Sequence, residues 1–300
     1  MDSRDYVYAF DIQGLDGAPA DFELPSGISN PIAGVFLPQA APDWLGRRKY
    51  PARILLATEE ALWVIAHSTA CVPPARILLR DLEALECARF LLLGWIGLHT
   101  GIGEHVLAYN QRSCDVVDRF LLGIKARWMP RELRFCRVSK QTFGAALDQK
   151  FNFAWSSEAI DEHEYPLIRY FQPTTVHRRR WFLYRRESWS AGDLLVLTER
   201  RVLWIAERYG TVYAPYGVVS RSAPLSSLRG FHPCMLNNQP SLECVLSSGR
   251  TWSFQLATGL ESEARRFTDC VNGVLPLLKE PGRHLDRRTS DAGLENEHLQ

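Results

Sequence analysis

The residues of this chain best suited to chemistry are two clusters of basic side chains. The first lies between Trp44 and Tyr50 and consists of Arg47, Arg48 and Lys49. The second is interleaved with aromatic residues and consists of Arg178, Arg179, Arg180, Arg185 and Arg186. Guanidinium groups bind phosphate in a bidentate manner, and aromatic rings suit the headgroup level of a bilayer. Each cluster is therefore a candidate site for an anionic ligand.

The same pattern also has purely structural interpretations. Arginine-rich loops are often just solvated, and arginines alternating with aromatic residues also describe a strand with one wet face. The N-terminal segment 1–24 has six acidic residues against Arg4 alone, so it can neutralise the clusters within the molecule. The formal net charge of +1 argues against nucleic acid as the partner, since nucleic-acid binders are usually basic overall.

Residues able to catalyse a reaction form no familiar arrangement. Gly101 and Gly103 lack the third glycine and the following helix of a nucleotide loop. The run Asp161-Glu162-His163-Glu164 has no second ligand cluster near it, so we interpret it as a solvated linker. No serine-hydrolase, zinc-peptidase or Cys/His signature occurs. The sequence predicts a protein that is not an enzyme and holds no metal or cofactor. An enzyme with an unrecognised site between domains is the alternative.

Cysteine usage and hydropathy bear on the compartment. The seven cysteines are odd in number and no pair has a two-residue spacing, which favours free thiols in a reducing cytosol over disulfides or a zinc site. The longest apolar run, 90–98, is about half of what a membrane-spanning helix needs. The acidic start does not resemble a signal peptide. We expect a cytoplasmic protein, with a peripheral position at the inner face of the membrane as a variant.

The elements that must position the basic clusters are marked by a hairpin pattern that occurs twice. Segments 53–67 (RILLATEEALWVIAH) and 193–207 (DLLVLTERRVLWIAE) align without a gap, with Thr58 on Thr198. Each has two short apolar runs around a four-residue polar turn, which is typical of a β-hairpin. An expected strand precedes each hairpin, at 31–39 and 166–174.

Further strand patterns and one amphipathic helix follow each hairpin in the same order, which indicates an internal duplication. The predicted organisation is an acidic arm (1–24), a first domain (25–128), a linker with a short helix at 141–151 (129–162), a second domain (163–276) and a disordered tail (277–300).

Strands followed by one C-terminal helix resemble a pleckstrin-homology-like (PH-like) domain. The stretch LLVLTERRVLWIAE resembles the hairpin of bacterial PH-like and GRAM-like domains, with Thr198 and Arg201 in matching places. The first copy departs from that pattern, with Ala61 in place of the arginine. The resemblance implies an α+β, mainly β fold of two partly open β-barrels, each closed by its helix.

The resemblance also directs attention to the loop between the first two strands of each copy, where both basic clusters lie. It implies a binding or scaffolding protein without catalysis. We expect a protein partner or self-association. Peripheral binding to anionic membrane lipids through the basic loops is the alternative.

Overall fold

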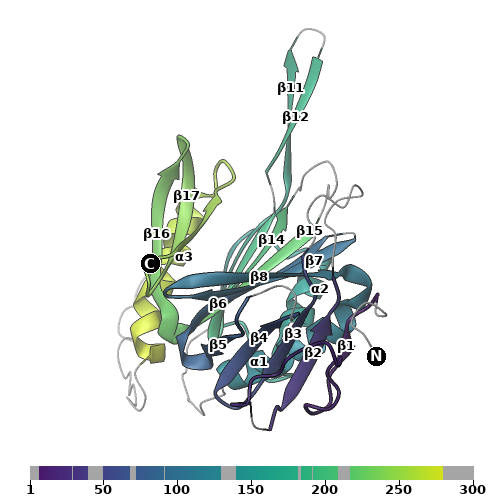
Figure 1. The fold of residues 1–300 in the computed structure, drawn as a ribbon. Helices are drawn as coiled ribbons and strands as arrows, with labels where there is room; N and C mark the ends of the chain where they lie inside the picture. The colour runs from purple at the N-terminus through teal and green to yellow at the C-terminus, as the bar shows by residue number, and fades with distance from the viewer. Residues whose placement is uncertain are drawn as a thin grey trace, which may run out of the picture.

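The computed structural model describes most of the chain, and the described parts are mainly β with three α-helices (Figure 1). The described residues are 7–28, 30–39, 50–67, 72–90, 92–129, 140–181, 184–190, 192–208 and 217–279. For 175–181, 184–190 and 208 only the backbone is described. The expectation of an α+β, mainly β fold is confirmed at this level.

The first half of the chain forms a five-stranded sheet, a three-stranded meander and a helix. The sheet order is β1 (Phe10–Asp11), β2 (Ala33–Leu37), β3 (Arg53–Ala57), β4 (Ala61–Ala66) and β5 (Ala75–Leu78). The 3-10 turn η3 (Leu79–Asp81) leads into β6 (Leu82–Phe90), β7 (Leu93–Thr100) and β8 (Gly103–Asn110). A second turn, η4 (Gln111–Ser113), and the helix α1 (Cys114–Trp128) complete this half.

The second half opens with a short strand and a helix, β9 (Gln141–Gly144) and α2 (Gln149–Glu158). The next elements are β10 (Ile168–Gln172), β11 (Thr175–Trp181), β12 (Tyr184–Ser190), β13 (Asp193–Leu197), β14 (Arg201–Arg208) and β15 (Gly217–Pro224). The last are η5 (Leu225–Ser227), β16 (Leu228–Leu236), β17 (Gln239–Leu246), β18 (Thr251–Gln255) and α3 (Glu261–Lys279).

Both halves contain four antiparallel strands, a 3-10 turn, a three-stranded meander and a helix in the same order. The equivalent hairpins share their internal bonds. The Thr58 N–H donates to the Ala61 carbonyl at 2.8 Å, and Thr198 does the same to Arg201 at 2.9 Å. In each turn the threonine hydroxyl accepts from the N–H three residues on, at 3.1 Å. The gapless sequence match therefore corresponds to matching backbone structure.

The two halves share one continuous sheet. Its order is β8-β7-β6-β15-β14-β13-β10-β9, so the first meander strand of the first half pairs with the fourth strand of the second half. This antiparallel pairing of β6 with β15, which we call the seam, runs from Leu85 opposite Ser222 to Phe90 opposite Gly217. The halves are consequently joined by backbone hydrogen bonds as well as by side chains.

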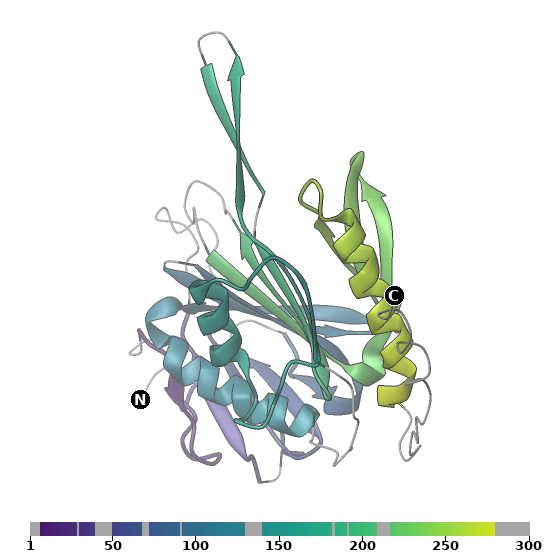
Figure 2. The same cartoon turned by 180° about the vertical axis from the view of Figure 1, so that it is seen from behind.

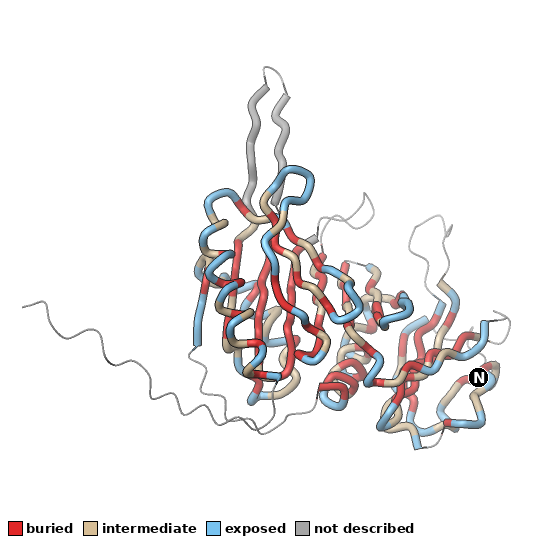
Figure 3. Tube along the Cα trace, turned by 90° about the vertical axis from the view of Figure 1, so that its left-hand side faces the viewer, coloured by how far each residue is buried: buried red, intermediate tan, exposed pale blue. Residues whose placement is uncertain are grey.

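Each half has its own apolar core between its two sheets, and Figure 3 shows buried stretches along the strands of both. Helix α1 closes the first core with Val117, Phe120, Leu121 and Ile124, which recur at helical spacing. Helix α3 closes the second with Ala264, Phe267, Val271, Leu275 and Leu278. The amphipathic patterns read from the sequence correspond to these two helices.

One local expectation needs correction here. Residues 141–144 form strand β9, parallel to β10, where the sequence predicted a helix over 141–151. The helix begins at Gln149, where the Asp148 carboxylate accepts from the Phe151 N–H at 2.8 Å and caps it. Phe143 lies on a strand because pairing with β10 buries it, and tertiary pairing outweighs a short periodic pattern.

The acidic arm is ordered over its described part. Ile12 and Phe22 are buried against the outer face of the first sheet, as is Ile28 just after the arm, and β1 pairs with β2. Residues 280–300, most of the expected tail, lie outside the described residues.

Candidate functional site

The second basic cluster lies on a two-stranded antiparallel ribbon, β11 and β12, which stands away from the body of the molecule (Figures 1 and 2). These arginines were predicted to lie in a loop, and that prediction was wrong for the backbone, which forms two strands. The arginines occur as consecutive runs, and the β-branched and aromatic residues that favour a strand flank them: Val176, Trp181, Tyr184 and Trp189. The cluster at Arg47, Arg48 and Lys49 lies outside the described residues.

The ribbon register sets like charges against each other. Arg179 is opposite Arg186 and Arg180 is opposite Arg185, while Arg178 is opposite Glu187. Like charges directly opposite on an antiparallel pair are destabilising, and an isolated two-stranded hairpin is marginal in water. The register thus brings the positions of four arginines together in neighbouring pairs on the ribbon.

The base of the ribbon is fixed to the body by buried polar groups. The Gly192 N–H donates to the Thr174 hydroxyl at 3.1 Å, and that hydroxyl donates to the Glu207 carboxylate. The Glu207 side chain, on β14, is 2% exposed and pairs with Lys150 of α2. Residues just before β11 and just after β12 are thus tied to the same carboxylate, which sets where the ribbon leaves the sheet.

The described part of the acidic arm, from residue 7 on, does not lie against the ribbon. Asp11 pairs with Arg119 at 2.7 Å and Asp21 with His67 at 2.8 Å, both in the first half. In Figure 1 the N-terminal strand β1 and the ribbon occupy opposite ends of the molecule. In the described part of the arm, Asp11 and Asp21 therefore pair with side chains of the first half.

A buried charge network lies behind the seam and joins both halves. The Glu158 carboxylate, at the end of α2, pairs with Lys125 of α1 and with Arg89 of β6 at 3.0 Å. The Ser220 hydroxyl of β15 donates to the same carboxylate at 2.8 Å. Burial alone raises the pKa of Glu158, but Lys125 and Arg89 outweigh it and lower the pKa to about 2. Glu158 is therefore ionised and couples three elements.

A second buried pair adjoins this network. The side chains of Arg201 and Glu164 are both 0% exposed, with Arg201 Nε 2.8 Å from the carboxylate. Arg201 also donates to the Glu158 carbonyl at 2.6 Å and to the Ser222 hydroxyl at 2.9 Å. The interpretation of 161–164 as a solvated linker was therefore wrong for Glu164. A signal was present, because the second hairpin turn has arginines where the first has Glu60 and Ala61.

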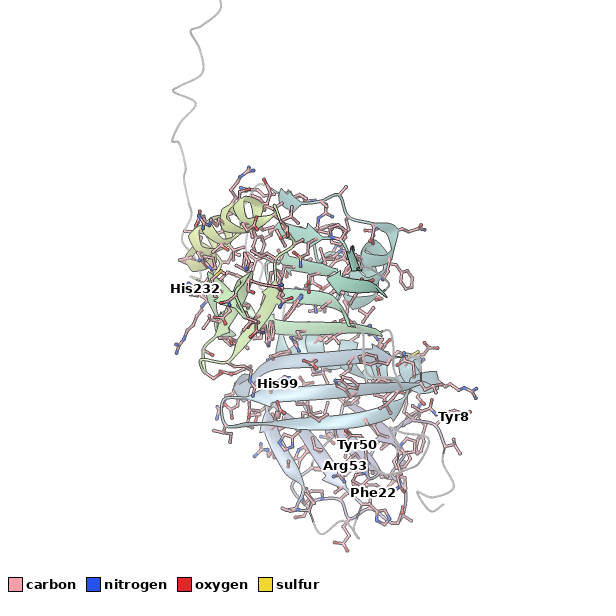
Figure 4. The ribbon with its side chains drawn as sticks, turned by 90° about the horizontal axis from the view of Figure 1, so that it is seen from above. Tyr8, Phe22, Tyr50, Arg53, His99 and His232 are labelled. Carbon is pink, nitrogen blue, oxygen red and sulfur yellow. The ribbon has the colours of Figure 1, made fainter. Side chains whose placement is uncertain are left out.

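On the opposite face of the shared sheet, a polar cleft of about 290 Å³ lies where β6, β7 and β8 meet β18. His99 marks its position in Figure 4. Glu86 pairs with Arg221 at 2.6 Å and Glu104 with Arg250 at 3.2 Å. Burial lowers the pKa of His99, and Arg250, 2.8 Å from its Nδ1, lowers it further. The cleft combines converging polar groups with a perturbed histidine, but its acids and bases already neutralise each other.

Comparison of the sequence with models of known protein families finds no match, and comparison with curated proteins finds none either. Over the described residues, no group of three His, Cys, Asp or Glu side chains is placed to hold a metal ion. Within the same residues, no helix is long and apolar enough to cross a membrane.

Proposed function

We propose that this chain is a non-enzymatic binding module built from two PH-like domains, and that the ribbon β11–β12 docks on an anionic membrane surface. The observation that carries the proposal is the ribbon itself, a projecting pair of strands with arginine set against arginine. Trp181 ends β11 and Tyr184 begins β12, so aromatic residues occupy the far end and arginines follow behind. That order suits a bilayer, in which aromatic rings sit at the interface and arginines meet lipid phosphates.

The PH-like assignment is supported by the repeated order of four strands, three strands and a helix. The absence of catalysis is supported by the cleft around His99, where Glu86 and Glu104 are each held by an arginine. A general acid or base there would first have to leave its ion pair.

The proposal is tested by co-sedimentation with vesicles of phosphatidylcholine alone or mixed with phosphatidylserine. We expect binding only to the anionic vesicles, and weaker binding as salt rises, since salt screens surface charge. Each basic residue near an anionic leaflet contributes about 1 kcal/mol, so reversing three should weaken binding by roughly a hundredfold or more. The variant is Arg178→Glu, Arg179→Glu and Arg180→Glu together.

The matched control changes the net charge equally at exposed arginines away from the ribbon. These are Arg80, Arg229 and Arg265. If both triple variants lose vesicle binding equally, the loss follows from the net charge of the protein and not from the position of the arginines on the ribbon. If the unchanged protein fails to sediment with anionic vesicles at low salt, the membrane proposal is wrong.

A second candidate function is scaffolding through a protein partner or self-association. The observation that favours it is the apolar end of the β16–β17 hairpin, where Met235 is 66% and Leu236 is 39% exposed. Exposed apolar side chains grouped at a hairpin tip are typical of a protein contact. Replacing both by Ser should abolish such a contact and leave vesicle binding unchanged.

A further inference from the structure

The seam joins the halves by pairing β6 with β15. Because the two halves repeat the same order of strands, each of these strands has an equivalent in the other half that could form the same pairing with another molecule. At the seam Cys87 of β6 is opposite Ser220 of β15, and the Ser220 hydroxyl oxygen lies 3.4 Å from the Cys87 carbonyl oxygen. The Cys87 backbone therefore faces β15. Residues two apart in a strand direct their backbone groups to the same side, so Leu85 and Arg89 face β15 as well.

Each partner of the seam has an equivalent at a sheet edge. Strand β16 occupies in the second half the place of β6, directly after the 3-10 turn, and it is an edge of its three-stranded sheet. Strand β5 occupies the place of β15 and is an edge of the first sheet. A second copy pairing its β5 with this β16 would repeat the seam. Such head-to-tail contacts do not close, and they build open chains.

The register identifies the positions that are equivalent to the centre of the seam. Leu78 of β5 is opposite Ala61, and Pro224 of β15 is opposite Arg201, the gapless equivalent of Ala61. Counting back four residues from each makes Pro74 the equivalent of Ser220. Both β6 and β16 begin directly after their 3-10 turns, at Leu82 and Leu228, which makes Pro233 the equivalent of Cys87.

Both positions equivalent to the centre of the seam are therefore proline, Pro233 within β16 and Pro74 directly before β5. Proline has no N–H to donate to an added strand and is a known means of protecting an edge. Pro233 is two residues from Phe231, whose backbone N–H and carbonyl face away from β17 toward Asn272. The missing donor of Pro233 thus faces the open side. Residues 72–74 before β5 are exposed and outside the strand, so β5 has four residues where β15 has eight.

A third difference lies on the closing helices. Asn272 of α3 binds the edge backbone of Phe231 in both directions, at 2.9 Å to its N–H and 2.8 Å to its carbonyl. The pairs Arg119-Phe120 and Arg266-Phe267 align the two helices, and on that alignment Asn272 is the equivalent of Lys125. Lys125 extends instead to Glu158 in the charge network behind the seam. In the second half the residue at this position, Asn272, instead binds the backbone groups of Phe231 at the edge of β16.

We infer that Pro74, Pro233 and Asn272 restrict this strand pairing to the single seam within the chain, so that a second copy is not added head to tail. The partner excluded is another molecule of this chain, and the surfaces involved are the free edges of β5 and β16. The inference is independent of the membrane proposal, because neither edge includes the ribbon.

The test restores the seam residues at each edge separately. Pro73→Val with Pro74→Ser gives β5 the sequence that β15 has at Val219 and Ser220. Pro233→Ala with Asn272→Ala frees the edge of β16 without adding a thiol. Masses are measured by light scattering after gel filtration, with circular dichroism to confirm folding. We expect each variant alone, and the unchanged protein, to be monomeric. An equimolar mixture of the two should double in mass, and the combined variant should form longer, concentration-dependent oligomers.

The control variant is Pro51→Ser, which removes an exposed proline outside both edges and should remain monomeric. If the β5 variant does not fold, Pro74→Ser alone takes its place in the mixture. A folded mixture that stays monomeric at all concentrations would overturn the inference. So would unchanged protein that assembles with β16 newly protected from hydrogen exchange.

Discussion

At the scale of single residues, the two halves differ most in buried charge. Ala61 and Arg201 occupy equivalent turns, yet only Arg201 carries a charge, and it is fully buried beside Glu164. A buried ion pair rarely adds stability over an apolar pair, but losing one partner leaves an uncompensated charge and is costly. The network of Arg201, Glu164, Glu158, Lys125 and Arg89 therefore fixes how the 158–164 segment sits against both halves.

Glu158 makes this network sensitive to acid. Its pKa is lowered from 4.5 in the unfolded chain to about 2 in the fold, so the folded state binds fewer protons between these values. Stability contributed by the carboxylate is complete above about pH 4.5 and is lost as the pH falls toward 2. We expect the midpoint of urea unfolding to fall steeply over this window, and to fall less steeply in Glu158→Gln.

The control for this prediction is Glu162→Gln, because the Glu162 side chain is 86% exposed. It should keep the pH dependence of the unchanged protein. If Glu158→Gln shows the same slope as Glu162→Gln, other carboxylates account for the acid sensitivity and the role assigned to Glu158 is wrong.

Single residues were the least predictable level of this structure. The sequence shows acidic residues near 158–164 and arginines in the second hairpin turn, but not that they meet. Burial of Glu164 depends on α2 lying across the outer face of β14, and that placement comes from tertiary packing of Phe151 on Phe171, Leu194 and Leu203. No local spacing encodes such a contact.

At the scale of elements, the ribbon depends on its base. Gly192 lies between the end of β12 and the start of β13, where a Cβ would come within 2.9 Å of the Phe151 ring and 3.0 Å of the Thr174 hydroxyl. Backbone alone fits there. Because Thr174 and Gly192 bind the Glu207 carboxylate together, a side chain at 192 pushes the two ends of the ribbon away from their anchor.

We therefore expect Gly192→Ala to destabilise the protein by about 1–3 kcal/mol, the usual cost of an overpacked site. It should also weaken binding to anionic vesicles, because the arginines lose a fixed position. Chemical denaturation measures the first effect and sedimentation the second. Gly101→Ala is the matched control, since nothing lies within 4 Å of a Cβ there. A Gly192→Ala protein as stable as the control would show that the base tolerates a side chain.

Elements with a strong local pattern were predictable, and the exceptions have a common cause. The hairpins at 53–67 and 193–207 and the closing helices follow from apolar spacing, because each buries one face. The ribbon and β9 did not follow. The charge along β11 and β12 left a solvated loop and a strand with one wet face as alternative interpretations, and β9 is defined by its pairing with β10 rather than by its own residues.

At the scale of the whole molecule, the seam makes the halves one folding unit. The pairing of β6 with β15 and the network around Glu158 cross between them, so neither half can unfold without exposing backbone and charge of the other. The duplicated pattern in the sequence predicted two separate domains joined by a linker. It did not predict that β6 and β15 would pair and make one sheet continuous across both halves. A strand that is buried on both faces has a similar sequence pattern whether or not another strand pairs with its edge.

The coupling of the two halves through the seam can be tested by introducing a proline, the residue that occupies the equivalent position 74 in the first half. Ser220→Pro places in the seam the proline found at position 74, and it removes both the Ser220 N–H and the hydroxyl bond to Glu158. Because that loss falls at the centre of the pairing, the halves should uncouple while each keeps its own core. We expect hydrogen exchange to show lost protection in β6 and β15 with protection retained in β3 and β13, and unfolding to separate into two transitions. Loss of protection in all four strands would mean that neither half folds without the seam. Retained protection in β6 and β15 would mean that side-chain contacts alone hold the halves together, and that strand pairing is not what couples them.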